Sequence, residues 1–190
     1  MDTRKAAAWF IIGIMVLSIA GFIGGGLSSS TQNTPQTQEF NGYTFTRETN
    51  QWTVIISGQK YGFLYFPSEL STINLPINTN SWRNKEKIYL IQDALNASSF
   101  PLENSLNLVE AVFYTNNVRL QKACFQEENC PDLPIVSCTS SALVVRSPLS
   151  NITETKLSSD DQCLIIEPSS PLELERTTER IIYQFLGVMP

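Results

Sequence analysis

The chain has 190 residues, of which 42% are hydrophobic and 16% charged, and its formal net charge is −5. This composition is typical of one globular domain with an appendage and excludes a wholly disordered chain. The chain contains no histidine, which excludes His general bases, Ser-His and Cys-His nucleophile pairs and His-ligated metals. No cluster of Lys and Arg is apparent, so nucleic acid and anionic lipid headgroups, which both need a basic surface, are not expected partners.

The N-terminal part of the chain predicts a membrane-spanning helix. Residues 6–23 (AAAWFIIGIMVLSIAGFI) carry no charge, and as a helix they would span about 27 Å, close to the roughly 30 Å hydrocarbon core of a bilayer. Arg4 and Lys5 precede this run, and the next basic residue is Arg47. The positive-inside rule then places residues 1–5 in the cytoplasm and the rest outside. We therefore expect a single-pass protein of the cell membrane.

A cleavable signal peptide is the main alternative to a retained anchor. Ser18-Ile19-Ala20 is a small-x-small cleavage site after a shorter apolar region. Apolar residues continue past that site to Ile23, which favours the anchor. Both interpretations export the remainder of the chain.

Residues 24–39 (GGGLSSSTQNTPQTQE) have almost no apolar content and predict a flexible tether. As a random coil, this stretch would span on the order of 20 Å. Residues 40–190 then form the extracytoplasmic domain.

Three short strands joined by tight turns are predicted between Phe40 and Phe66. Each of three stretches either alternates between polar and apolar residues or is a short apolar run: 42–47, 52–57 (WTVIIS) and 60–66 (KYGFLYF). Pro67 ends the last of them. Such spacing is typical of an antiparallel meander.

The next segment predicts a strand, a helix and a second strand. KIYLI at 87–91 is a compact apolar strand, and VRLQKAC at 118–124 has the composition of another. Between them, a helix is expected from Pro101, because its apolar residues recur on one helical face. These residues are Leu102, Leu106, Val109 and Phe113. The arrangement indicates one βαβ crossover.

Two more strands, ALVVRS and CLIIE, precede a well-signalled closing helix. Ser170-Pro171-Leu172-Glu173 has the pattern of a capping box with Pro at the first helical position, and Gly187 ends the helix. The expected buried stripe consists of Leu174, Ile181, Ile182 and Phe185. The sequence therefore predicts an α+β domain with one mixed sheet, built from the meander and the βαβ unit, and two helices packed on it.

The four cysteines are spaced C-x5-C-x7-C-x24-C, from Cys124 to Cys163. Neither short interval suits the close ligand pairs of a zinc site or the C-x-x-C of a dithiol oxidoreductase. An exported domain meets an oxidising environment, so we expect two structural disulfides. Of the three pairings that four cysteines allow, we favour Cys124–Cys130 and Cys138–Cys163.

Two further features bear on the same compartment. Asn96-Ala97-Ser98 and Asn151-Ile152-Thr153 are glycosylation sequons in predicted loops. We therefore treat Asn96 and Asn151 as candidate acceptors.

Catalytic signals are weak, and we expect no metal, no cofactor and no catalytic motif. Asp93 follows the KIYLI strand, where sites often occur, and Lys122 could serve Ser137 or Ser140 as a base. We favour a structural interpretation of each, with Asp93 as a solvated carboxylate in a loop and Lys122 as an outward-facing strand residue. An aromatic surface that binds a glycan or small solute is a further alternative, formed by Tyr43, Trp52, Tyr61 and Tyr65.

The arrangement resembles small single-span surface proteins of archaeal type. The matching features are the short basic start with one span, the NGYTF…W hairpin, KIYLI, AC-x5-C-PDLPI and the closing IIYQFLGV. This resemblance covers most of residues 40–190 and implies no activity. We expect a membrane-tethered interaction or accessory domain with a protein partner at the membrane surface, and the alternatives are a membrane-bound hydrolase and the aromatic binding module.

Overall fold

The computed structural model describes residues 36–92, 103–128, 130, 132–146 and 153–190. The predicted cytoplasmic segment, the predicted span and most of the predicted tether lie outside these residues, as do Asp93, Asn96 and Asn151. Within the described ranges, no helix is long and apolar enough to cross a bilayer.

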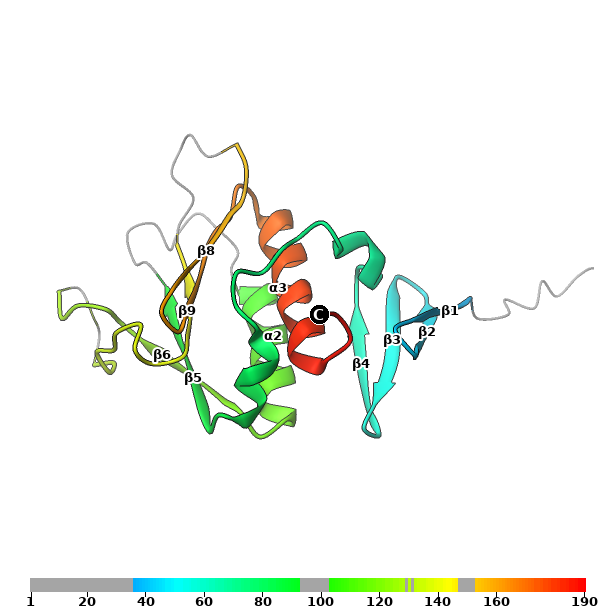
Figure 1. The fold of residues 1–190 in the computed structure, drawn as a ribbon, viewed down its shortest axis with the longest axis horizontal. Coiled ribbons are helices and arrows are strands. Elements are labelled where there is room, and N and C mark those ends of the chain that lie inside the picture. Colours follow the sequence, from blue (N-terminus) through cyan, green and yellow to red (C-terminus); the bar gives the residue numbers. More distant parts are fainter. Residues whose placement is uncertain (1–35, 93–102, 129, 131, 147–152) are drawn as a thin grey trace, which may run out of the picture. The chain divides into compact units, whose positions relative to one another are not determined.

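A four-stranded antiparallel meander opens the domain (Figure 1). Its turns at Asn41-Gly42 and Ser57-Gly58 have positive φ at both residues, as two-residue hairpin turns require. The first strand was not expected, because three of its four residues, 37–39, lie within the stretch assigned to the tether. The strands are β1 (Thr37–Phe40), β2 (Tyr43–Glu48), β3 (Gln51–Ile56) and β4 (Gln59–Phe63).

The later strands form a second sheet with the order β6-β5-β7-β9-β8. Only β8, at one edge, runs antiparallel to its neighbour. The helix α2 (Glu103–Thr115) connects β5 to β6, which confirms the predicted βαβ crossover. The strands are β5 (Lys87–Gln92), β6 (Arg119–Ala123), β7 (Ala142–Val145), β8 (Lys156–Asp160) and β9 (Cys163–Glu167).

The prediction that the meander and the βαβ unit share one sheet is wrong. No strand of the meander pairs with a strand of the mixed sheet. Instead, the meander lays its apolar face on α3 (Pro171–Leu186). The Tyr183 ring lies 6.0 Å from Phe45 and 4.2 Å from Phe63 between ring centroids. The two helices therefore separate the two sheets, as Figure 1 shows.

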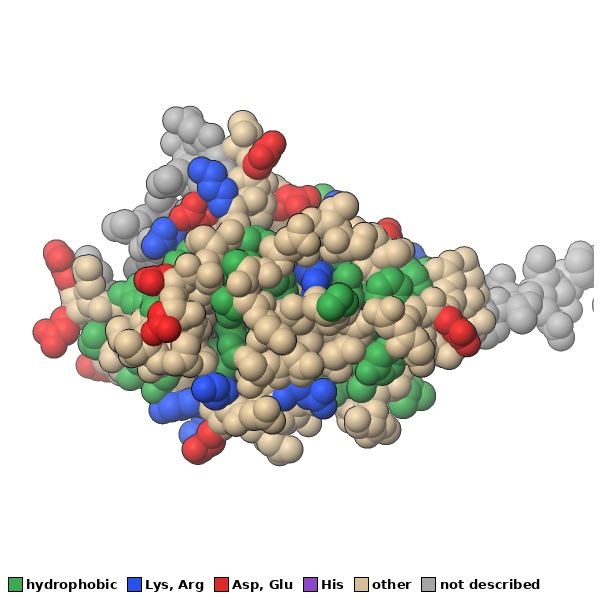
Figure 2. Space-filling model, viewed as in Figure 1, with side chains coloured by type: hydrophobic (Ala, Val, Ile, Leu, Met, Phe, Trp, Pro, Cys, Tyr) green, Lys and Arg blue, Asp and Glu red, His purple; other side chains and the backbone are tan. Residues whose placement is uncertain are grey.

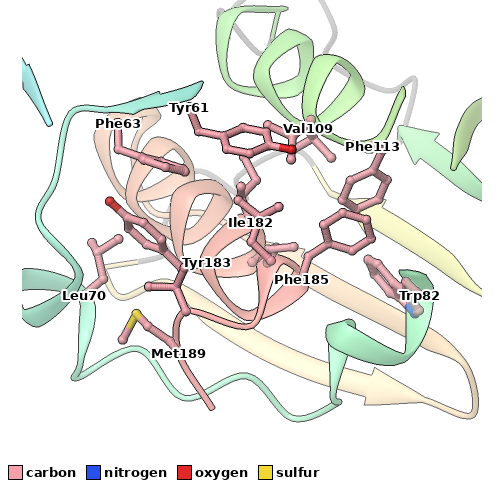
Figure 3. Packing of buried hydrophobic residues seen from close by; sticks show 14 of the residues in the cluster. Tyr61, Phe63, Leu70, Trp82, Val109, Phe113, Ile182, Tyr183, Phe185 and Met189 are labelled. Carbon is pink, nitrogen blue, oxygen red and sulfur yellow. The ribbon is translucent and has the colours of Figure 1, made fainter. Parts of the chain in front are cut away.

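One core joins these three layers (Figure 3). Phe185 of α3 stacks on Phe113 of α2 with 4.3 Å between ring centroids, and Phe113 in turn packs edge-on against Trp82. All four residues of the predicted apolar stripe of α3 are fully buried. Side chains of α3 and α2 therefore share one core with side chains of both sheets.

The other face of the mixed sheet has a smaller apolar cluster of its own. Side chains alternate along a strand, so Ile88 and Leu90 face the helices while Tyr89 and Ile91 face away. Val136, from the connection between β6 and β7, packs on this outer face.

The segment between β4 and β5 crosses α3 and is held by polar side chains of that helix. Two short 3-10 helices, η1 (Pro67–Leu70) and η2 (Thr79–Asn84), lie within it. The carboxylate of Glu179 accepts hydrogen bonds from the backbone N–H groups of Leu64 (2.7 Å) and Tyr65 (2.9 Å). Further contacts join Gln184 to Thr79, Arg180 to the Ile73 carbonyl, and the Tyr183 hydroxyl to the Tyr65 carbonyl.

Candidate functional site

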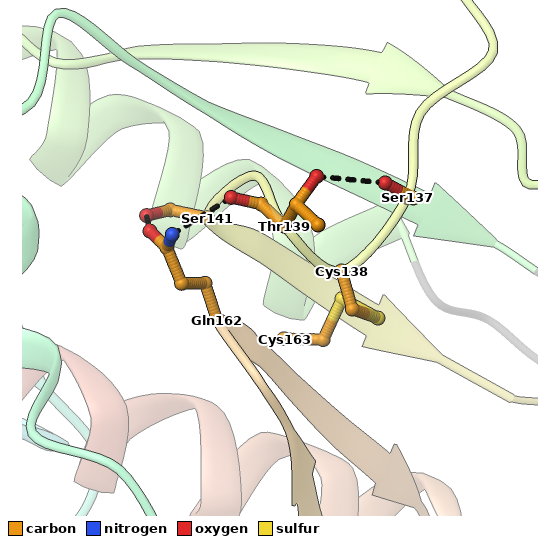
Figure 4. The surroundings of a disulfide bond; sticks show 6 residues. All are labelled: Ser137, Cys138, Thr139, Ser141, Gln162 and Cys163. Carbon is orange, nitrogen blue, oxygen red and sulfur yellow. Dashed lines mark hydrogen bonds between the residues drawn. A yellow bond between two sulfur atoms is a disulfide. The ribbon is translucent and has the colours of Figure 1, made fainter.

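All four cysteines are paired, as Cys124–Cys130 and Cys138–Cys163. The first disulfide closes a short loop, and the second ties the β6–β7 connection to the first residue of β9. Around the second (Figure 4), the Gln162 side chain donates to the Thr139 carbonyl (2.7 Å) and accepts from the Ser141 hydroxyl (3.0 Å). These bonds fix the end of the connection against the sheet.

The connection between β6 and β7, which the two disulfides hold, occupies the place where a crossover helix would usually lie. The steps from β5 to β6 and from β6 to β7 run in opposite directions across the sheet. Right-handed connections must then lie on opposite faces. α2 covers one face, and the described residues between Cys124 and Ser141 lie on the other, where Val136 and Cys138 pack. A helix would hold itself together by a regular series of backbone hydrogen bonds. The described residues of this segment instead have one isolated bridge, Cys124 with Ile135, single turn bonds such as that from the Ser140 N–H to the Ser137 carbonyl (3.0 Å), and two disulfides.

The candidate Ser/Lys pair does not form. Lys122 is in register with Leu90, whose side chain faces the helices. Ser137 and Ser140 belong to the connection on the opposite face, and the Ser137 hydroxyl shares a hydrogen bond with that of Thr139 (2.8 Å). No group of three metal-ligating side chains occurs in the described part of the chain.

The four candidate aromatic residues face inward. Trp52 exposes 6% of its surface and Tyr61 exposes 8%, while Tyr43 and Tyr65 are half-buried against the core. A buried indole cannot stack on a ligand, so these side chains do not make an exposed binding platform. Trp52 and Tyr61 are core residues of the meander, and Tyr43 and Tyr65, the latter after the end of β4, pack against that core.

Glu179 is the most strongly perturbed carboxyl group of the described residues. Burial raises its pKa to about 7, and the hydrogen bonds from Leu64 and Tyr65 oppose this rise. Both carboxylate oxygens already accept backbone hydrogen bonds. Its surroundings therefore assign Glu179 to holding the β4–η1 segment rather than to chemistry on a substrate.

A polar hollow lies where α2 and α3 end beside η2. We call it the amide hollow; its volume is about 450 Å³ and no lining side chain is apolar. It is lined by Asn80, Arg83, Asn84, Thr115, Asn116 and Asn117.

Basic side chains gather next to this hollow. Lys87 begins β5 and is in register with Arg119, which begins β6, and the Arg119 N–H donates to the Glu86 carbonyl (3.0 Å). Figure 2 shows Lys and Arg side chains grouped along this side of the molecule. We call Arg83, Lys85, Lys87 and Arg119 the basic edge; Glu86 is the acidic residue among them.

This basic edge corrects the expectation that the chain has no Lys/Arg cluster. Three of its four basic residues could have been found in the sequence, because Arg83, Lys85 and Lys87 fall within WRNKEK. Arg119 and the asparagines after α2 join them only through the pairing of β5 with β6, which the sequence alone does not define.

The chain matches no protein-family model, and no curated protein or solved structure is significantly similar to it.

Proposed function

We propose that this chain is a membrane-tethered extracytoplasmic domain that binds a partner at the cell surface. The observation that carries the proposal is the pairing of all four cysteines in two disulfides. Disulfides persist in oxidising compartments and are rare where thiols are kept reduced. The uncharged run at residues 6–23, preceded by Arg4 and Lys5, supplies the tether in this proposal.

The binding role is supported by side chains that the fold does not use. Among the described residues, Asn84 and Arg83 make no side-chain hydrogen bond and no ion pair with a described partner, although both line the amide hollow. Concave surfaces with convergent polar groups are the usual places where ligands bind. This arrangement favours an interaction domain over the hydrolase alternative.

The proposal is tested in native membranes from cells that make the full chain. Cysteines are alkylated without reduction and mapped by mass spectrometry, and intact cells are treated with protease before membrane isolation. We expect both disulfide-linked peptides, no alkylated cysteine, and digestion of residues 37–190 from outside. Alkylated thiols, or a domain that resists protease until the cells are lysed, would refute the extracytoplasmic location.

The N-terminal sequence of the mature protein separates the two forms of export. A retained anchor leaves residues 6–23 on the protein and keeps it in the membrane after an alkaline wash. A protein that begins after Ala20 and is released by the wash would refute the tether while leaving the export intact.

A further inference from the structure

We propose that the amide hollow and the basic edge together bind an acidic carbohydrate, a sugar unit that carries a carboxylate. This inference deepens the proposed function and rests on it only for where the ligand is met, outside the membrane. Binding itself is a property of the folded chain and is measured independently of topology.

The lining of the amide hollow matches the chemistry of a sugar. Four carboxamides, a hydroxyl and a guanidinium face a volume of about 450 Å³, within the roughly 300–1,000 Å³ range of small-molecule sites. A carboxamide presents a donor and an acceptor side by side, and adjacent sugar hydroxyls present the complementary pair. The absence of apolar side chains from this lining argues against an acyl chain or an apolar ligand.

One carboxamide is held in place by the fold. The Asn116 Nδ2 donates to the Val112 carbonyl (2.7 Å) and to the Tyr61 hydroxyl (3.0 Å). These bonds orient the side chain and leave its Oδ1 without a partner among the described residues. Tyr61 thus acts as a positioning residue that links the meander to the hollow, a role different from the ligand stacking that its sequence suggested.

The guanidinium of Arg83 and the carboxamide of Asn80 converge near the end of α3. Arg83 Nη1 and Asn80 Nδ2 each lie 3.9 Å from the position that a Cβ on Gly187 would take. Gly187 has φ +79°, a conformation that disfavours any other residue. The backbone conformation therefore favours glycine here, while a Cβ would make only ordinary van der Waals contact with both groups.

The charge of the site selects an anion. Arg83, Lys85, Lys87 and Arg119 outnumber Glu86 at this edge, in a chain whose net charge is −5. Arginine presents a planar fork of donors that fits a carboxylate through two hydrogen bonds. Lys87 is partly engaged, with Gln121 (3.4 Å) and the Tyr89 ring, so Arg83 in the hollow is the expected carboxylate ligand.

Two other polyanions fit these observations less well. Nucleic acid recognition uses a longer basic stripe with exposed aromatic rings for stacking, and no aromatic side chain lines this hollow. An anionic bilayer offers a plane of headgroups, whereas the asparagines line a concave site. Both are included as arms of the test.

The test is a calorimetric titration of the full chain, purified in a nonionic detergent, with trisaccharides of galacturonic and glucuronic acid. The methyl ester of each trisaccharide retains the hydroxyls but removes the charge. We expect an acidic trisaccharide to bind and its methyl ester to bind at least about ten-fold more weakly, since charge-assisted hydrogen bonds are lost. Absence of binding to both acids would overturn the proposal, whatever the topology experiment shows.

Matched variants locate the site. Arg83→Gln is expected to weaken binding at least about ten-fold, and Asn84→Asp, which places a carboxylate in the hollow, is expected to weaken it similarly. Arg146→Gln removes the same charge just after the carboxyl end of β7, at the opposite end of the parallel strands from Lys87 and Arg119. Arg146 pairs there with Glu167 (2.8 Å), and this variant should leave binding unchanged. Near-UV circular dichroism, which senses buried Trp82 beside Arg83, verifies that each variant is folded.

Three further outcomes would overturn the assignment. Equal weakening by Arg83→Gln and Arg146→Gln would indicate general charge attraction. Tighter binding of a single-stranded oligonucleotide would assign the edge to nucleic acid. Tighter binding of vesicles made of equal parts phosphatidylglycerol and phosphatidylcholine would assign it to the membrane surface.

Discussion

Glu179 is a buried acid whose proton affinity depends on the fold. Its raised pKa, about 7, comes first from burial, and the nearby carboxylates of Glu175 and Glu69 raise it further. The backbone N–H groups of Leu64 and Tyr65 favour the charged form but do not cancel the effect of burial. Between an unfolded pKa of 4.5 and about 7, the folded state holds a proton that the unfolded state has released.

This difference predicts how stability varies with pH. The free energy of unfolding should fall as pH rises from 4.5 towards 7, by up to about 3 kcal/mol from this group. Glu179→Gln should flatten the dependence across that window, because glutamine does not titrate. Urea unfolding at several pH values measures the slope, with Glu110→Gln, an exposed site, as the control. An unchanged slope in Glu179→Gln would contradict the assignment.

Within α3, the burial of some residues could be predicted from the sequence and the burial of others could not. The stripe Leu174, Ile181, Ile182 and Phe185 was predicted and is fully buried, because helical periodicity exposes such a face. Glu179 and Gln184 are buried as well, yet no apolar pattern marks them. Their burial depends on the β4–β5 segment folding across α3, a long-range event that periodicity does not report.

At the scale of elements, the two disulfides should contribute unequally. They enclose sequence separations of 25 residues (Cys138–Cys163) and 6 residues (Cys124–Cys130), which a chain-entropy estimate converts to about 3.5 and about 2.2 kcal/mol. Replacing both cysteines of a pair by Ser should therefore lower the free energy of unfolding more for the longer loop. Chemical denaturation of the two double variants measures the difference.

The reverse order would contradict this estimate. The wild-type chain, reduced and then denatured in the same way, is the control for the Cys-to-Ser replacements themselves. It lacks both disulfide bonds but keeps the sulfur atoms. Its loss of stability should approach the sum of the two double variants.

Elements with local signals were predicted, and those without them were missed. α3 begins at the predicted cap, where the Ser170 hydroxyl accepts from the Glu173 N–H (3.2 Å), and ends at Gly187. β8 was not predicted, because most of its side chains are exposed and polar and only its pairing with β9 makes it a strand. The amide hollow was unpredictable for the same reason: its residues come from η2 and the end of α2, which meet through tertiary packing.

At the scale of the whole molecule, the two sheets should unfold together. Phe185 is fully buried in the layer between them, and Phe→Ala at such a site typically costs about 3–5 kcal/mol. We expect Phe185→Ala to lower the urea midpoint by the same amount whether unfolding is followed by Trp52 in the meander or by Trp82 in η2. Variants that retain one of these tryptophans and lack Trp9 supply the two signals.

Tyr114→Ala, a truncation of a ring that is 78% exposed on α2, is the matched control and should change the midpoint little. Two separate midpoints for the Trp52 and Trp82 signals would show that the layers are independent. Cooperative loss of both would establish the shared core as one folding unit.

The position of α3 in the chain has a consequence for the time at which folding can occur. α3 follows every other described element, and the contacts that close the core span long stretches of chain, up to the bond from Asn41 to the Val188 carbonyl, 147 residues apart. During N-to-C synthesis, the meander therefore lacks its helical partner until α3 emerges, and the mixed sheet, whose inner face α2 already covers in part, lacks the rest of its cover. For the extracytoplasmic domain proposed above, this delay would be useful during export. A chain passes through a translocation pore unfolded, and a core that cannot close early would not obstruct that passage.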